Sequence, residues 1–276
     1  MSWFTRMLRN LVGLRPLDAG PDRSPNGASS FHLVWQVPSS ALGVRLAEVS
    51  AVLEIQVPPG VEVLYYWALQ VDLADSEGIW GGAHTGLQWN PRYPGGTAVN
   101  WGGYASADRG GAVLAGTVSS LPGYPDDLNT LAYPWSPGRP YRLRVFASPE
   151  VAGAWRAEVT DLLSGSTDTI RDLLPPLGRS ASGGYLTRPV VWSEVFAECD
   201  APSVTVRWSG LQGLDVAGEQ VRPATILVNY QAPEAGGCPN TTVAQDGAGG
   251  FLQVTNVPRL VKQGAVLAVP ADAALV

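Results

Sequence analysis

The sequence alternates between apolar and polar residues with a period of two, most clearly in VEVLYYWALQVDL at residues 61–73. Successive side chains of a β-strand point to opposite faces, so this alternation predicts a strand with one buried and one polar face. The buried face would carry Val63, Tyr65, Trp67, Leu69 and Val71, and the polar face Glu62, Tyr66, Gln70 and Asp72. A chain built from such segments must pack its apolar faces together as layers of sheet.

The same pattern recurs along most of the chain in short runs separated by turn-forming residues. The sequence holds 32 Gly and 23 Pro, which suits many short strands joined by tight turns. Helical spacing is almost absent after the N-terminus, apart from a turn expected near TIRDLL at residues 169–174. Strands are predicted at residues 31–37, 49–57, 62–73, 83–90, 97–104, 111–118, 140–148, 154–161, 190–199, 203–208, 224–230, 239–244 and 250–256. With no internal repeat, they predict an all-β fold, a two-sheet antiparallel β-sandwich.

The predicted organisation has three parts. Residues 1–15 form a short amphipathic helix, residues 16–30 an irregular linker, and residues 31–276 the β-sandwich domain, with a subdivision near 200–203 as the alternative. The helix is predicted from apolar residues at helical spacing, namely Trp3, Phe4, Met7, Leu8 and Leu11. It would dock on the sandwich, on a protein partner or on a membrane surface.

Charge and composition exclude several classes of function. The net charge of −6 provides no general attraction for nucleic acid, and no nucleic-acid partner is predicted. The sequence has no phosphate-binding loop and no dinucleotide signature, so no cofactor is predicted. No apolar run is long enough to span a membrane, and Arg6, Arg9 and Asn10 interrupt what would be a signal peptide. We therefore predict a cytoplasmic protein, with peripheral membrane association through residues 3–14 as an alternative.

Cys199 and Cys238 are the only cysteines. Together with the distant His32 and His84 they do not supply the closely spaced ligands of a zinc site, and no metal is predicted. The two cysteines form either two reduced thiols or one disulfide. Without a secretory signal, free thiols are favoured.

Two cross-strand pairs can be predicted from the segments YRLRVFA and WRAEVTD. If these segments form a hairpin, Arg142 and Arg144 face Glu158 on the solvated side. Such pairs contribute about 0.2–1 kcal/mol each to stability.

The densest group of polar candidates lies in residues 80–104, WGGAHTGLQWNPRYPGGTAVNWGGY. A period of two puts His84, Gln88 and Asn90 on one side of a strand, and Asn100 on the matching side of the next. Trp89 and Trp101 fall on the opposite, core-facing side. A face of amides and an imidazole can bind a polar, uncharged ligand.

A second candidate segment is VVWSEVFAECD at residues 190–200. Alternation places Val191, Val195, Ala197 and Cys199 on an apolar face, and Trp192, Glu194, Phe196, Glu198 and Asp200 on the other. Aromatic rings interleaved with carboxylates are typical of sugar-binding or sugar-cleaving sites. On a strand, residues two apart have Cα atoms about 6.8 Å apart, so Glu198 and Asp200 are the pair with glycosidase-like spacing.

Four of these segments carry a family resemblance: HTGLQWN (84–90), VNWGGY (99–104), YRLRVFA (141–147) and WSEVF (192–196). They resemble the G-[IL]-Q and W-x-E-x-F strand motifs of an uncharacterised bacterial family, a domain of unknown function, over about residues 62–210. The resemblance implies a concanavalin-like or jelly-roll-like sandwich and an association with glycans. It implies no catalytic residues.

Three functions follow from these observations. The leading prediction is a non-catalytic β-sandwich module that binds a carbohydrate or other polar ligand through His84, Gln88, Asn90, Asn100, Trp192 and Glu194. The second is a structural or assembly protein that docks through its N-terminal helix. The third is a glycoside hydrolase or lyase that uses Glu198 and Asp200.

Overall fold

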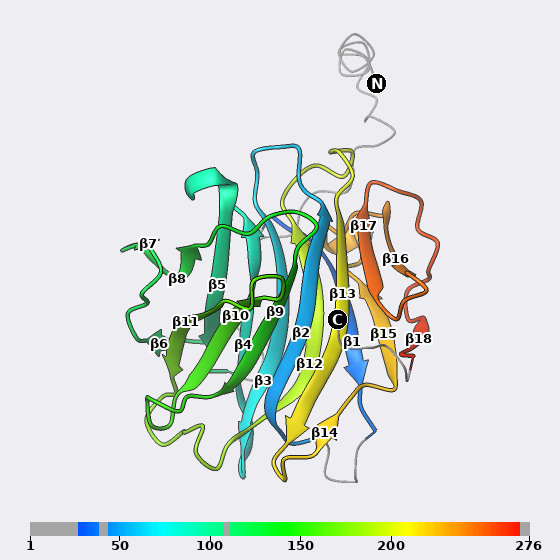
Figure 1. Ribbon diagram of the computed structural model, residues 1–276. Coiled ribbons are helices and arrows are strands. Elements are labelled where there is room, and N and C mark those ends of the chain that lie inside the picture. Colours follow the sequence, from blue (N-terminus) through cyan, green and yellow to red (C-terminus); the bar gives the residue numbers. More distant parts are fainter. Residues whose placement is uncertain (1–26, 39–43, 107–110, 271–276) are drawn as a thin grey trace.

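The computed structural model describes residues 27–38, 44–106 and 111–270 (Figure 1). The predicted N-terminal helix at residues 1–15 lies outside the described residues. No helix in the described part of the chain has the length and hydropathy needed to cross a membrane.

Strands are the main regular structure of the described chain, and they pair antiparallel in two series. The first series runs in the order β18 (Val266–Ala268), β15 (Thr225–Tyr230), β1 (Ser29–Gln36), β12 (Tyr185–Val195), β3 (Tyr65–Asp75), β4 (Gly78–Trp89), β5 (Thr97–Tyr104), β8 (Asp127–Ala132) and β7 (Gly123–Tyr124). The second runs in the order β16 (Thr241–Gln245), β17 (Phe251–Thr255), β13 (Thr205–Asp215), β2 (Leu46–Val57), β9 (Pro140–Ala147), β10 (Trp155–Asp161), β11 (Thr167–Leu174) and β6 (Ala115–Gly116).

Three short elements complete this arrangement. The two-residue strand β14 (Gln220–Val221) pairs with β13, and two short 3-10 helices span Pro94–Gly96 and Pro233–Ala235. The pair Leu46–Leu186 joins β2 of the second series to β12 of the first. The result is the predicted two-sheet antiparallel sandwich, in which β2 and β13, from either side of residues 200–203, lie next to each other.

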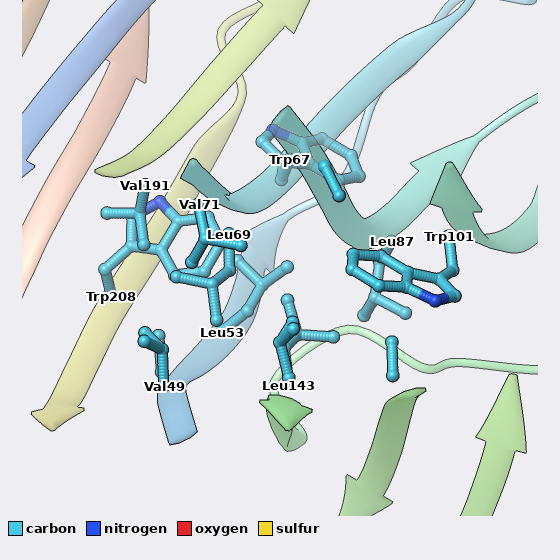
Figure 2. Close-up of a cluster of buried hydrophobic side chains, with 14 of the residues drawn as sticks. Val49, Leu53, Trp67, Leu69, Val71, Leu87, Trp101, Leu143, Val191 and Trp208 are labelled. Atoms are coloured by element: carbon cyan, nitrogen blue, oxygen red, sulfur yellow. The ribbon is translucent and has the colours of Figure 1, made fainter. Parts of the chain in front are cut away.

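The core lies between the two sheets. Figure 2 shows Leu69 and Val71 of β3 together with Val49 and Leu53 of β2 and Leu143 of β9, all of them fully buried. The largest fully buried side chains are four indoles, Trp67, Trp101, Trp155 and Trp208. The alternation predicted for residues 61–73 is confirmed, because Tyr65, Trp67, Leu69 and Val71 belong to this core while Tyr66 and Ala68 belong to a separate cluster on the other side of β3.

Residues 169–174 are not a helical turn, and this prediction is wrong. They lie in β11, where the pairing with β10 shifts register: Ala157 faces Arg171 but Glu158 faces Thr169. Ile170 is therefore an extra residue in the strand, a β-bulge, and it is buried in the core. The bulge puts Ile170 and Leu173 three apart on one face, which imitates helical spacing.

Other strand boundaries also differ from the prediction. β8 was not predicted, because Asp126 and Asp127 make its start resemble an acidic loop. The predicted strand at 190–199 begins earlier, at Tyr185, and ends at Val195, before the bend that leads to Cys199. The hairpin of β9 and β10 has the predicted register, with Arg144 opposite Glu158 and an ion pair of 3.3 Å between them. Arg142 lies opposite Thr160 instead.

Cys199 and Cys238 form a disulfide, so the prediction of two free thiols is wrong. The bond joins the segment after β12 to the segment before β16, with 5.5 Å between the two Cα atoms. β1 lies between β12 and β15 and brings their ends together, and the Cys238 amide donates to the Ser29 hydroxyl at 2.8 Å. The prediction failed because it rested on the cellular compartment, whereas the pairing depends on which strands are neighbours.

Candidate functional site

The outward face of the first sheet carries a shielded group of polar and aromatic side chains, which we call the polar face. It comprises Tyr66, Gln70, His84, Gln88, Asn100, Trp192 and Glu194, contributed by β3, β4, β5 and β12. These residues alternate with the core residues on the same strands. Tyr66, Gln88, Asn100 and Trp192 are each at most 7% exposed, so neighbouring side chains shield one another from water.

The register of β3 aligns three of these residues in one row. Gln88 of β4 and Glu194 of β12 both lie directly opposite Tyr66 of β3, on its two sides. Residues opposite each other in a sheet point to the same face, so the three side chains lie together. Two strand spacings separate the Cα atoms of Gln88 and Glu194, about 10 Å. The side chains of both residues therefore reach the space above Tyr66.

Tyr66 is anchored by hydrogen bonds that lead away from Glu194. Its hydroxyl donates to Asn100 Oδ1 at 2.8 Å, and Asn100 Nδ2 donates to Thr130 Oγ1 at 3.0 Å. Gly86 lies between Tyr66 and Asn100 on the same face, and a Cβ there would lie 1.9 Å from the backbone oxygen of Trp67. Only glycine permits this close approach of β3 and β4. Burial, followed by the charge of Glu194, raises the pKa of Tyr66 well above its usual value, so the phenol keeps its proton.

Gln88 is held in one orientation from two sides. Asn90 Nδ2 donates to Gln88 Oε1 at 3.0 Å, and Trp135 Nε1 donates to the Gln88 backbone oxygen at 2.9 Å. The first bond leaves both hydrogens of Gln88 Nε2 available, since no acceptor among the described residues binds them. Gln88 therefore presents an amide donor to the polar face.

Aromatic rings close the other end of the group. Trp192 Nε1 donates to Gln70 Oε1 at 3.1 Å, which fixes the indole. The Trp192 ring lies edge-on to Tyr66 at 4.9 Å and tilted against His84 at 5.8 Å, measured between ring centroids. His84 also contacts the ring of Tyr104 at 6.2 Å. These rings give the polar face an apolar wall beside Glu194.

Glu194 is the one carboxylate in the row and is half-buried. Burial raises the pKa of the Glu194 carboxyl, and no ion pair or hydrogen bond to it occurs among the described residues. Its neighbour on β1, Ser30, is bonded instead to Gln231, through the amide at 2.7 Å and the hydroxyl at 3.1 Å. A carboxyl group in such surroundings exchanges protons at a higher pH than an exposed glutamate.

The structure brings the six residues selected from the sequence onto one side of one sheet. His84, Gln88, Asn100, Trp192 and Glu194 belong to the polar face, and Asn90 follows β4 and contacts it through Gln88. Two further members were not selected, Tyr66 and Gln70, although the alternation had put both on the polar side of their strand. The missing information was that β3 lies between β4 and β12. Trp101 is fully buried, and Trp89 is partly buried against the core, as predicted.

Glu198 and Asp200, the pair predicted for a glycosidase, lie outside the strand on which their spacing was based. Both are exposed and lie after the end of β12, next to the disulfide, where the strand spacing used for the prediction no longer applies. The next carboxylate along the outward side of β3 from Tyr66 is Asp72, six residues and about 20 Å away. It pairs with Arg188 at 3.6 Å. A glycosidase needs two carboxyl groups within about 10 Å, a requirement that Glu194 and Asp72 do not meet.

No protein-family model and no curated protein matches this chain. Among solved structures, it is similar to scytalido-glutamic peptidase with a peptide-based transition-state analogue, at 13% identity and a TM-score of 0.44, covering 83% of this chain and 98% of that one. It is similar to SCP-B, a member of the eqolisin family of peptidases, in a complex with the tripeptide Ala-Ile-His, at 12% identity, a TM-score of 0.43 and the same coverage. Peanut lectin with a 9mer peptide has 10% identity and a TM-score of 0.29, covering 86% of this chain and 84% of the lectin.

These comparisons overturn the leading functional prediction. The prediction of a non-catalytic module for a carbohydrate or other polar ligand is wrong by this finding. The similar structures with the higher TM-scores are peptidases, and the lectin has a lower TM-score. Likeness at this level does not assign an activity to this chain.

Proposed function

We propose that this protein is a hydrolase that cleaves the acyl bond of an amide or an ester, with Glu194 as the general acid–base. The observation that carries the proposal is the half-buried carboxyl group of Glu194, whose pKa is raised by burial and which shares a row with the amide donor of Gln88. Catalytic groups are commonly tuned in this way.

The reaction needs one proton to move twice. The Glu194 carboxylate accepts a proton from a water molecule while the water oxygen attacks the carbonyl carbon. Gln88 Nε2 donates a hydrogen bond to the carbonyl oxygen, which becomes negative in the tetrahedral intermediate. Glu194 then returns the proton to the leaving nitrogen or oxygen, and the bond from that atom to the carbonyl carbon breaks. The products are a carboxylic acid and an amine or alcohol.

The surrounding residues support this chemistry. Tyr66 is held by Asn100, and Trp192 by Gln70, so the floor of the site is fixed before substrate arrives. The apolar wall of Trp192 and Tyr66 keeps the site poor in water, which strengthens the hydrogen bond from Gln88. The row of Glu194, Tyr66 and Gln88 holds one carboxylate beside an amide donor, an arrangement that suits carbonyl chemistry, whereas glycoside cleavage uses a pair of carboxyl groups.

The test uses fluorogenic peptide amides and aryl esters, assayed from acid to neutral pH. We expect Glu194→Gln to lower kcat/KM by about 10²–10⁴-fold, the usual contribution of a general acid–base. Glu198→Gln is the matched control, because it makes the same change at an exposed position four residues on, and it should retain wild-type turnover. Equal turnover by wild-type protein and Glu194→Gln, or no turnover of either substrate class, would disprove the proposal.

The disulfide supports a different compartment from the cytoplasm that the sequence predicted. Disulfides persist in oxidising environments and are rare where thiols are kept reduced. We infer that the protein works in an oxidising compartment, with Cys199 and Cys238 bonded. Alkylation of the protein isolated without reductant should label neither cysteine, and labelling of both would contradict the inference.

A further inference from the structure

A cleft of about 330 Å³ lies at one edge of the sandwich, away from Glu194. It is bounded by β6 and β11 of the second sheet and by the β7–β8 hairpin of the first, elements that lie close together in Figure 1. Its walls are largely apolar, formed by Val118, Leu121, Tyr124, Leu128 and Leu131. Val118 is 98% exposed and Leu128 65% exposed. This volume is in the range of small-molecule sites, and grouped exposed apolar side chains mark binding surfaces.

Arg171 of β11 reaches this cleft from between the two sheets. Arg171 lies opposite Ala157, a residue of the core between the sheets. Its side chain therefore points inward, to the side of β11 that faces the other sheet. Its Nη1 donates to the Leu128 backbone oxygen and, at 3.0 Å, to Asn129 Oδ1, both on the other sheet. A Cβ at position 116 would lie 2.0 Å from Arg171 Nη2, so Gly116 leaves the room that the guanidinium fills.

The charge of Arg171 is buried and has no acidic partner among the described residues. The residue is 3% exposed, and its Nε has no hydrogen-bond acceptor there. Burial lowers the pKa of Arg171, with no carboxylate to oppose that effect. Asp127 also lines the cleft, but its carboxylate accepts from the Tyr93 hydroxyl at 3.3 Å and from the Thr130 amide at 3.2 Å. Burying a charge without a partner is costly, and a guanidinium binds carboxylates through a planar pair of donors.

We propose that this cleft is a binding site for an apolar carboxylate, whose carboxylate binds Arg171 and whose hydrocarbon part packs on Val118, Tyr124 and Leu128. Two kinds of ligand have this chemistry: a free apolar acid, and a peptide whose C-terminal residue is apolar. This site is independent of the proposed catalysis, because none of its residues belongs to the polar face.

The test is a titration followed by backbone NMR shifts, with two matched pairs of probes. N-acetylleucine and N-acetylleucinamide differ only in the carboxylate and represent a peptide C-terminus, whereas 4-phenylbutyrate and 4-phenylbutanamide represent a free acid. We expect saturable shifts at residues 116–119 and 123–128, with at least one acid binding about tenfold more tightly than its amide, the usual gain from a charged hydrogen bond. The tighter acid identifies the source of the ligand.

Four variants make the test decisive. Leu128→Asp adds a negative charge at an exposed apolar wall and should weaken acid binding about tenfold, while Leu177→Asp, at a fully exposed leucine that does not line the cleft, should leave it unchanged. Glu194→Gln should also bind the acid normally, which separates this site from the catalytic proposal. Arg171→Gln should bind acid and amide equally. If Arg171→Gln does not fold, the acid affinity of Leu128→Asp tests the site instead. Equal affinity for acid and amide, or normal binding by Leu128→Asp, would overturn the proposal.

Discussion

Glu194 and Gln88 lie on opposite sides of Tyr66, each directly across from it in register, so an acid and an amide share one row of the sheet. The two groups are held differently. Gln88 is fixed by Asn90 and Trp135, whereas the Glu194 carboxylate is constrained by burial alone. This asymmetry suits a rigid donor and a proton carrier, and it leads to separate predictions for each residue.

Replacing Gln88 by alanine should remove the proposed donor to the developing oxyanion. Loss of one such donor commonly lowers kcat by about 10²–10³-fold, and KM should change little because the interaction forms mainly in the transition state. Steady-state kinetics on the best amide or ester substrate measure both constants. Gln56→Ala, at an exposed position in β2, is the control and should behave as wild type. A rise in KM with unchanged kcat would instead make Gln88 a substrate-binding residue.

Replacing Glu194 by glutamine should stabilise the folded protein at neutral pH. The pKa of Glu194 is raised in the folded state, so its ionised form is unfavourable there and stability is lost as pH rises through that pKa. Glutamine has the same shape and no charge. The Tm of Glu194→Gln should therefore exceed that of wild type at neutral pH, and the two should converge in acid where Glu194 is protonated. A lower Tm for Glu194→Gln at neutral pH would mean that an attractive partner holds the carboxylate.

The pH dependence of turnover should follow the same group. Because Glu194 acts first as a base, kcat/KM should rise with pH through its pKa, at a higher pH than the value of about 4.3 for an unperturbed glutamate. A pH–rate profile of wild-type protein measures this value. A profile that rises at or below the ordinary glutamate pKa would assign the base to a different carboxyl group.

Removing the Tyr66 hydroxyl should cost stability through Asn100. Tyr66→Phe leaves Asn100 Oδ1 buried without its donor, which costs about 1–3 kcal/mol in the free energy of unfolding. Tyr124→Phe removes a hydroxyl bonded to the Arg92 backbone oxygen at the surface, and should change stability by no more than about 0.5 kcal/mol. Urea denaturation of the two variants and wild type gives the comparison. Equal effects of the two changes would show that the buried hydrogen bond adds nothing.

Opening the disulfide should destabilise the fold substantially. The bond closes a loop with a sequence separation of 39, for which chain-entropy arguments give about 4 kcal/mol of stabilisation. The double variant Cys199→Ser, Cys238→Ser should unfold at correspondingly lower urea, and addition of reductant should shift wild type toward the variant without moving the variant itself. If the double variant and wild type unfold together, the bond contributes no net stability.

The two faces of β3 and β4 could be predicted from the sequence, because alternation depends only on neighbouring residues. The alternation separated Tyr66 from Trp67, and Gln88 from Trp89, without knowledge of any partner strand. Which strands are neighbours could not be predicted in the same way. β3 lies between β4, which follows it directly, and β12, which comes far later in the chain, and this order creates the row of Glu194, Tyr66 and Gln88.

The remaining errors arise where local pattern and long-range packing disagree. The extra residue Ile170 breaks the alternation of β11. Neither the strand nor the inward position of Arg171 could therefore be predicted from the sequence pattern. The segment after Val195 continues the alternation in sequence but is no longer a strand. Glu198 and Asp200 are exposed in this segment, and Cys199 is bonded to Cys238.

The disulfide also decides how the molecule would carry mechanical load. Its closed loop contains β13 and β14 of one sheet and β15 of the other. A force that stretches the chain from its two ends passes from Cys199 directly to Cys238 and does not extend the residues between them. The fully extended oxidised protein is therefore shorter than the reduced protein by about 130–140 Å, the contour length of the residues inside the loop.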